Sequence, residues 1–162
     1  MILTPIFLTA AAALMQPAAE PAPAAPDPAY LAEQRQALDA LSEADGWRTT
    51  PSGLKYRVLI GRGTGERPTV QDRVMVHYVG RFVNGEVFDS SVERREAATF
   101  PLGRLIRGWQ EGIPMMSVGE RWEFAVPAEL AYGAGRGPIP GGATLFFKVE
   151  LIDIVDEEPA QR

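Results

Sequence analysis

Nucleophilic catalysis in proteins is usually built from cysteine, serine and histidine, and this chain offers little of that set. Its 162 residues include no cysteine and a single histidine, His77. A serine–histidine–carboxylate triad would have to use His77, but this residue alternates with apolar Val76 and Tyr78 in a strand-like run that offers no nucleophile beside it. We therefore interpret His77 as a surface or rim residue and expect no covalent catalysis.

Aromatic side chains beside loops are the stronger chemical signal. They are Tyr78, Phe88, Trp109, Tyr132 and Phe147. Phe88 is followed directly by Asp89, and Tyr132 by Gly133, so two aromatic residues lie where a strand gives way to a loop. An apolar cup with a few polar groups is typical of a ligand pocket, whereas aromatic residues at alternating positions often belong simply to the core. The pattern favours a pocket and leaves the core interpretation open.

Composition and charge exclude several other functions. Hydrophobic residues make up 46% of the chain and charged residues 23%, which is typical of a globular domain. The formal net charge of −5 argues against nucleic-acid binding, which needs a basic face. A zinc site would have to rest on carboxylates, and no segment has the spacing of a phosphate loop or a calcium loop. We therefore expect no metal and no cofactor.

The N-terminal part of the chain differs in composition from the rest. Residues 6–15 form an apolar run that is too short to span a bilayer, which takes about 20 residues, so no stable membrane insertion is expected. The run and the small residues after it predict a signal peptide over residues 1–19, although no Lys or Arg precedes Arg35. An Ala-rich tail or a buried apolar helix is the alternative. Residues 20–28, rich in Pro and Ala, predict an extended linker.

A short helix is predicted behind this linker. Asp27 offers an N-cap, Pro28 suits the first helical position, and Gly46 offers a C-terminal stop. We therefore assign residues 29–46 to an N-terminal helical segment, with the helix itself continuing to residue 44. Its thin apolar stripe consists of Leu31, Leu38 and Leu41. A stripe this narrow is poorly suited to a dimer interface. We therefore expect a monomer in which the helix docks on the following domain or frays.

Strands and one further helix are predicted for the rest of the chain. Alternating apolar residues predict strands at 54–60, 73–83, 86–88, 122–126 and 145–151. Asn84-Gly85 is a strong hairpin signal. The spacing of Ile106, Trp109 and Ile113 predicts one short helix.

A sheet with one apolar face must be covered, and this single helix is the cover that the pattern offers. The sequence therefore predicts an α+β fold in which an antiparallel β-sheet curls around one short α-helix, with a short N-terminal helix in front. Residues 47–156 form this domain, and residues 157–162 are a tail.

Seven short motifs then occur in an order typical of one family. They are residues 74–80 (VMVHYVG), 84–85 (NG), 88–91 (FDSS), 106–109 (IRGW), 116–120 (MSVGE), 131–133 (AYG) and 143–151 (ATLFFKVEL). Over residues 50–155 the chain resembles the FKBP-type, macrolide-binding peptidyl-prolyl cis/trans isomerases, and residues 50–56 resemble the entry to the bacterial exported members. The resemblance implies an FKBP-like fold and catalysis of rotation about X-Pro bonds.

The resemblance also implies a role for each matching residue. The walls of a proline pocket would be formed by Tyr78, Phe88, Trp109 and Phe147, with Trp109 as the floor. Leu105 and Ile106 would line the rim, where Ile106 would offer its backbone N–H to the bound peptide or macrolide. Asp89 would lie at the mouth, and Tyr132 would offer its hydroxyl to a substrate carbonyl.

Two further residues and two departures complete the comparison with the family. Ile139 falls in the loop that overhangs the site, and Arg94, or alternatively Arg95, falls where the family often has an arginine paired with the pocket aspartate. Ala98 stands where many members have an aromatic residue, which predicts a more open wall. The glycine-rich loop 133–142 predicts greater mobility above the site.

Partners and location follow from the same resemblance. We expect proline-containing polypeptides as clients, macrolides as further ligands, and export to the periplasm. Because a fold does not fix a function, a non-catalytic peptide-binding or chaperone module on the same fold remains the alternative.

Overall fold

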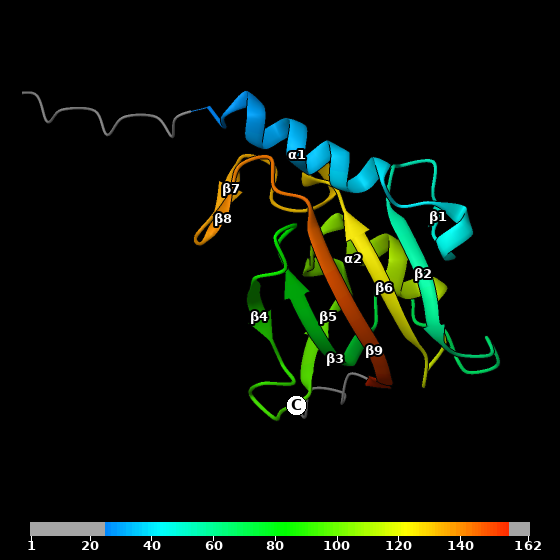
Figure 1. Cartoon of the computed structure of the whole chain (residues 1–162). Helices are drawn as coiled ribbons and strands as arrows, with labels where there is room; N and C mark the ends of the chain where they lie inside the picture. Colours follow the sequence, from blue (N-terminus) through cyan, green and yellow to red (C-terminus); the bar gives the residue numbers. More distant parts are fainter. Residues whose placement is uncertain (1–24, 156–162) are drawn as a thin grey trace, which may run out of the picture.

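The computed structural model describes residues 25–155, and its main feature is one antiparallel sheet (Figure 1). The strands of this sheet run in the order β1-β2-β6-β9-β3-β4, and β5 also pairs with β3. Their bounds are Arg48–Thr49 (β1), Lys55–Ile60 (β2), Arg73–Arg81 (β3), Val87–Ser90 (β4), Ala98–Pro101 (β5), Arg121–Val126 (β6) and Leu145–Val155 (β9). The long strands β3 and β9 form the centre, and the sheet curls around the helix α2, Arg107–Gly112.

Short elements connect these strands. They are the 3-10 turns η1 (Glu43–Asp45), η2 (Leu102–Arg104), η3 (Ile113–Met115) and η4 (Ala128–Leu130), and the small hairpin of β7 (Gly135–Arg136) and β8 (Ile139–Pro140). The β7–β8 hairpin stands away from the main sheet, near the N-terminal helix (Figure 1). The predicted α+β architecture is confirmed.

The core lies between α2 and the concave face of the sheet. Side chains alternate along β3, where Val74, Val76 and Tyr78 are buried and their neighbours are half-buried. Helix α2 lies close to β6 because Gly112 faces it: a Cβ at Gly112 would come within 2.5 Å of the Phe124 ring. The sheet and this one helix thus enclose a continuous apolar core.

The predicted hairpin at Asn84-Gly85 is confirmed. The Phe82 N–H donates to the Glu86 carbonyl at 2.9 Å, and β4 returns antiparallel to β3. Gly85 has a φ of 86°, a conformation that glycine adopts without steric cost. The turn therefore directs Phe88 and Asp89 back along β3.

The N-terminal helix α1 spans Pro28–Asp39 and begins as predicted. The Asp27 carboxylate accepts a hydrogen bond from the Ala29 N–H at 2.8 Å, with Pro28 in the first turn. The prediction that the helix continues to residue 44 is wrong, since the chain leaves it after Asp39. A separate turn, η1, follows; there the Ser42 hydroxyl donates to the Asp45 carboxylate at 2.6 Å, and the Ser42 backbone carbonyl accepts from the N–H groups of Asp45 and Trp47 at 3.1 and 3.2 Å.

Helix α1 docks on the domain. Gln34 is 5% exposed, and its side-chain oxygen Oε1 accepts a hydrogen bond from the Thr144 N–H at 3.0 Å. The Thr144 hydroxyl donates to the backbone carbonyl of Gln34 at 3.3 Å. Leu31 lies against Gly142, where a Cβ would come within 2.2 Å of it. These contacts connect α1 to the start of β9 and to the end of the β7–β8 hairpin.

Strand β2 forms where predicted, but its apolar face is only partly buried. Leu54 just before it is fully buried, whereas Val58 is 50% and Ile60 56% exposed. The pairing of β2 with β6 is irregular between these two residues, and the strand ends beyond the core. The alternation of apolar residues therefore predicts where the strand lies, but it does not show that the strand extends beyond the buried core.

The predicted signal peptide (residues 1–19), most of the predicted linker and the tail (residues 157–162) lie outside the described residues. Among residues 25–155, no helix is long and apolar enough to cross a membrane.

Candidate functional site

A cavity of about 380 Å³ opens between the concave face of the sheet, α2 and the β7–β8 hairpin. Six aromatic rings line it, those of Tyr78, Phe88, Phe100, Trp109, Tyr132 and Phe147. The other lining residues are Asp89, Arg104, Leu105, Ile106, Ala131 and Arg136. The site therefore combines an apolar interior with a polar and charged mouth.

Strand alternation and one glycine bring the wall residues together. Tyr78 and Gly80 share the inward face of β3, and Phe147 is paired opposite Gly80 on β9. A Cβ at Gly80 would come within 2.6 Å of Phe88 and 3.0 Å of Phe147, so the missing side chain gives both rings room. The inward periodicity of β3 and β9 thus sets one wall of the cavity.

Trp109, on α2, forms the floor. Its ring meets Tyr78 at 5.4 Å and Phe147 at 5.2 Å between centroids, both at 81°. Phe88 meets Phe147 at 5.6 Å and 89°. These edge-to-face contacts are favourable and fix the orientation of each ring. The cavity is therefore preformed, with little freedom in its walls.

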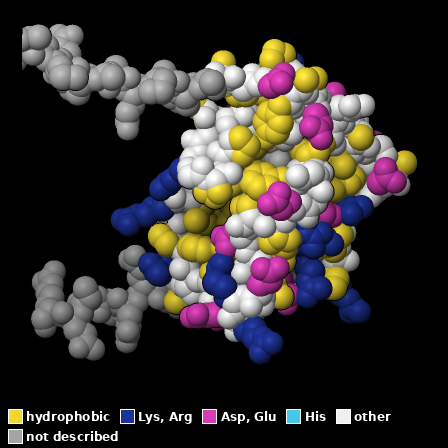
Figure 2. Space-filling view, turned by 60° about the vertical axis from the view of Figure 1, so that its left-hand side comes forward, with side chains coloured by type: hydrophobic (Ala, Val, Ile, Leu, Met, Phe, Trp, Pro, Cys, Tyr) yellow, Lys and Arg dark blue, Asp and Glu magenta, His cyan; other side chains and the backbone are white. Residues whose placement is uncertain are grey.

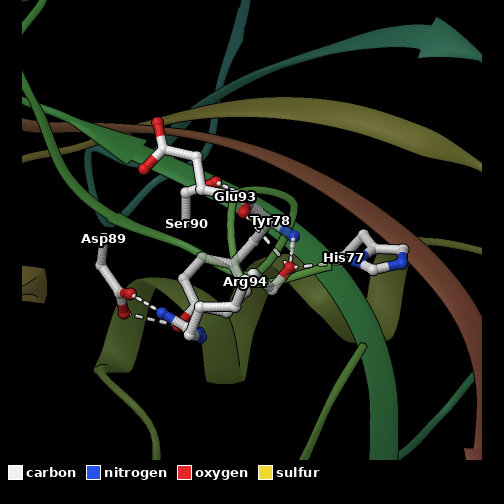
Figure 3. A network of polar contacts seen from close by, with 7 residues as sticks. His77, Tyr78, Asp89, Ser90, Glu93 and Arg94 are labelled. Atoms are coloured by element: carbon white, nitrogen blue, oxygen red, sulfur yellow. Dashed lines mark hydrogen bonds and ion pairs between the residues drawn. The ribbon is translucent and has the colours of Figure 1, made fainter. Parts of the chain in front are cut away.

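The mouth holds a compact polar network of Tyr78, Asp89 and Arg94 (Figure 3). The Tyr78 hydroxyl donates to the Asp89 carboxylate at 2.5 Å, and Arg94 forms an ion pair with the same carboxylate. Arg94 Nη2 also donates to the Tyr78 oxygen at 3.0 Å. Arg94, not Arg95, is thus the arginine beside Asp89; Arg95 instead adopts a positive φ of 56° in the turn after it.

This network sets the protonation states at the mouth. Burial opposes ionisation of Asp89, but the hydrogen bonds from Tyr78 and Arg94 outweigh it, so the pKa of Asp89 is lower than its ordinary value. Burial, reinforced by the hydrogen bond to Asp89, raises the pKa of Tyr78. At neutral pH the site therefore holds a carboxylate, a neutral phenol and a guanidinium.

Ser91 supports the network from behind. Its side chain is fully buried; the Tyr78 N–H donates to its hydroxyl oxygen at 2.8 Å, and the Ser91 N–H donates to the Tyr78 carbonyl at 3.0 Å. His77 Nδ1 lies 3.1 Å from the same hydroxyl, which comes from a segment outside the strand of His77. This serine is enclosed and bonded to backbone, and it therefore fixes the loop after β4 without reaching a substrate.

The structure brings most of the predicted site residues to one place. Eight of them line the cavity: Tyr78, Phe88, Asp89, Leu105, Ile106, Trp109, Tyr132 and Phe147. Ile106 directly precedes α2 as its N-cap residue, so its own N–H is outside the helical hydrogen-bonding pattern. Arg94 does not line the cavity but pairs with Asp89, which does, and Ile139 is buried in β8 and lines an adjoining recess.

Four lining residues were not predicted as site residues: Phe100, Arg104, Ala131 and Arg136. Phe100 lies on β5 opposite Val74, so pairing with the predicted strand 73–83 could have pointed to it. Ala98, on the same strand, does not line the cavity. Arg136 comes from the glycine-rich segment, where the sequence offered no periodicity.

Comparison with known proteins is consistent with this geometry. The family description "FKBP-type peptidyl-prolyl cis-trans isomerase" matches residues 64–152. The chain is 48% identical over 124 residues to FkpA of Aeromonas hydrophila, covering 76% of this chain and 45% of that protein. It is 46% identical over 129 residues to the FKBP-type 22 kDa isomerase of Escherichia coli, covering 78% and 62%. The chain thus spans about half the length of the curated relatives it matches.

Solved structures give the same assignment. The crystal structure of FkpA from Escherichia coli superposes with a TM-score of 0.73 at 38% identity, over 76% of this chain and 58% of that one. A peptidyl-prolyl cis-trans isomerase from Pseudomonas syringae superposes with a TM-score of 0.73 at 33% identity, over 82% of this chain and 98% of that one. The chain therefore belongs to the FKBP-type peptidyl-prolyl cis-trans isomerase family.

Proposed function

We propose that the protein catalyses cis/trans rotation of X-Pro bonds in polypeptide clients and that the aromatic cavity is where it does so. The observation that carries the proposal is a preformed, edge-to-face cage of aromatic rings with Trp109 as its floor. A proline ring is a compact apolar group, and such a cavity of about 380 Å³ suits it.

The chemistry requires no nucleophile. Rotation about an amide has a barrier of about 18–20 kcal/mol because resonance gives the C–N bond partial double-bond character. An apolar cage disfavours the charge-separated resonance form and can bind the twisted amide more tightly than the planar one. Binding energy alone therefore lowers the barrier, which fits a cavity whose lining residues include no serine.

The residues at the mouth would hold the flanking peptide while the prolyl bond turns. Tyr132 and Ile106 both line the cavity, which supports a role for the Tyr132 hydroxyl and the Ile106 N–H in bonding backbone groups of the client. Asp89 is held as a carboxylate by Tyr78 and Arg94, so its role is electrostatic and structural; a proton donor would need a raised pKa. Arg94 acts as a positioning residue through its ion pair with Asp89.

We further propose that the protein is exported and acts on exported clients. The apolar run at residues 6–15 and the small residues after it support a cleaved leader. A relative from Legionella longbeachae that is 42% identical over 119 residues is named an outer membrane protein, which supports a site of action outside the cytoplasm. The periplasm is the compartment that fits both observations. We also propose that macrolides can occupy the cavity.

Refolding of a protein whose slow phase is limited by one X-Pro bond tests the proposal. Uncatalysed isomerisation takes tens to hundreds of seconds, so catalysis by the full chain should shorten this phase in proportion to the amount added. The Asp89→Ala variant should shorten it less, while Glu43→Ala, exposed on η1, should act like the unaltered chain. Suppressed aggregation with an unchanged slow phase would instead show a peptide-binding module.

A further inference from the structure

A second groove adjoins the cavity, between α1, the β3–β4 turn and the β7–β8 hairpin. It encloses about 450 Å³. Its apolar surface is formed by Tyr30, Phe82, Val83, Pro138 and Pro140, and two exposed acidic residues, Glu33 and Glu86, also line it. Three segments far apart in the sequence thus form one groove, and α1 supplies three of its nine lining residues, Tyr30, Glu33 and Gln34.

The groove is continuous with the aromatic cavity. The Phe82 ring lies 4.9 Å from the ring of Phe88, which is a wall of the cavity. Pro138 lines both the groove and a recess that shares Phe88 and Tyr132 with the cavity. A client held by its proline and extended past Phe88 would therefore reach the groove within a few residues, each of which advances the chain by about 3.3–3.6 Å.

The two ends of this path differ in charge. Glu33 and Glu86 are exposed, no Lys or Arg lines the groove, and neither carboxylate takes part in an ion pair among residues 25–155. The cavity, in contrast, is lined by Arg104 and Arg136, and its one carboxylate, Asp89, is paired with Arg94. In Figure 2 the top of this face, where α1 lies, carries acidic side chains and almost no Lys or Arg, whereas Lys and Arg are mixed with acidic side chains farther down.

The pKa of Tyr30 agrees with this distribution of charged residues. Burial and, after it, the Glu33 carboxylate raise the pKa of the Tyr30 hydroxyl, as expected where negative potential is uncompensated. A long cationic side chain is stabilised by an aromatic ring that lies beside carboxylates without an ion-pair partner. Its methylene stem can lie on Phe82 and the prolines, and its charge can approach the Tyr30 face and the two carboxylates.

We propose that this groove binds a Lys or Arg side chain of the client, located a few residues from the prolyl bond in the cavity. The proposal rests on the proposed function, since it names the class of client that the same site prefers. Binding at both points fixes the direction of the peptide across the mouth, so α1 contributes to selectivity as well as to stability.

Affinity for a panel of labelled peptides tests the groove. Each peptide carries one central Leu-Pro bond in an Ala-rich sequence, with a single Lys moved through the four positions on either side. For the full chain, Kd should be about fivefold lower at one or two of these positions than for the all-Ala peptide, which is the scale of one or two partly exposed ion pairs. The gain should fall as NaCl is raised from 0.05 to 0.5 M, because the Debye length shortens to a few ångströms.

Variants locate the effect. The ratio of Kd values, Ala peptide to Lys peptide, should fall to about one in the Glu33→Gln/Glu86→Gln double variant and should persist in Glu43→Gln, a matched change outside the groove. A ratio of one at every position in the unaltered chain, or a ratio that survives the double variant or high salt, would overturn the proposal. The salt series uses the unaltered chain, so it tests the electrostatic contribution to binding even if the double variant folds poorly.

Exchange rates on the same peptides separate this proposal from the proposed function. If cis/trans exchange of the all-Ala peptide is accelerated, the proposed isomerase activity is supported whatever the Kd ratio is. If no peptide is accelerated, the isomerase fails, and the Kd ratio still decides whether the groove binds a cation.

Discussion

Asp89 is the carboxylate at the mouth of the cavity, and its surroundings keep it ionised. Its pKa in the folded protein is depressed, because the Tyr78 and Arg94 hydrogen bonds outweigh its partial burial. A carboxyl group whose pKa is lower in the folded than in the unfolded state stabilises the fold above its unfolded pKa, and this contribution is lost as the pH falls through the folded value. Asp89 should therefore matter for stability at neutral pH and cease to matter in acid.

This argument gives a prediction for the dependence of stability on pH. Between about pH 5 and 8 the free energy of unfolding of the unaltered chain should exceed that of Asp89→Asn by a constant amount, and the difference should shrink below about pH 4. Urea denaturation of both proteins from pH 2.5 to 8 measures it. A difference that stays constant down to pH 2.5 would mean that the ion pair with Arg94 does not lower the pKa of Asp89.

The hydroxyl of Tyr132 gives a prediction for catalysis. If it bonds the client only as the prolyl bond twists, Tyr132→Phe should lower kcat/KM for X-Pro exchange about fivefold, equivalent to about 1 kcal/mol for one hydrogen bond. Tyr56→Phe is the matched control, because Tyr56 stacks on Trp122 at 5.2 Å outside the cavity. Equal loss in both variants would contradict a role for Tyr132 at the site.

At the residue scale, motif and position together predicted most of the residues that line the cavity. Tyr78 and Phe147 follow from strand alternation, which determines which side chains face inward, and Phe88 follows from its motif. Arg136 could not, because it depends on how the glycine-rich hairpin folds back over the cavity, and no local periodicity encodes that path. His77, interpreted as a surface or rim residue, is half-buried, and its contact with Ser91 depends on pairing between distant segments.

Close approach of α2 to β6 is the feature of the fold on which the cavity floor depends. Gly108 and Gly112 face the sheet, and a Cβ at either position would come within 2.5 Å of Val126 or Phe124 respectively. Trp109 lies between these two glycines, so the depth of the floor follows from how closely the helix packs.

Gly112→Ala should therefore push α2 away from the sheet. We expect a loss of about 1–3 kcal/mol in the free energy of unfolding, as for other overpacked cores, even though Ala favours the helix more than Gly does. Arg107→Ala, exposed on the same helix, should change the free energy by less than about 0.5 kcal/mol. Urea denaturation compares them; equal stability of Gly112→Ala and the unaltered chain would show that the helix can shift without cost.

At the scale of elements, periodic segments were predictable and aperiodic ones were not. Strands β3, β6 and β9 and helix α2 each carry a clear apolar period, and each lies where the sequence indicated. The end of α1 was predicted too late, because Gly46 is a strong stop signal that belongs to η1. The β7–β8 hairpin, predicted as a mobile loop, forms through contacts with its own ends and with α1, which sequence pattern does not reveal.

For the molecule as a whole, the apolar stripe of α1 bears on the state of assembly. Leu31 lies on the domain at Gly142, and Gln34 on the same helix is bonded to Thr144. Because the helix uses this face within its own chain, we expect a monomer. Light scattering at about 10 and 100 µM should give the mass of one chain at both concentrations, and a mass twice as large would contradict the expectation.

The central claim is that X-Pro bonds rotate within the aromatic cavity. Exchange NMR of a Leu-Pro peptide with the full chain tests catalysis and location in one measurement. The account predicts cis/trans exchange far faster than the uncatalysed tens to hundreds of seconds, together with peptide-induced shifts of the Trp109 indole N–H and of Tyr132. Fast exchange without shifts at these residues, or shifts at these residues without faster exchange, would contradict it.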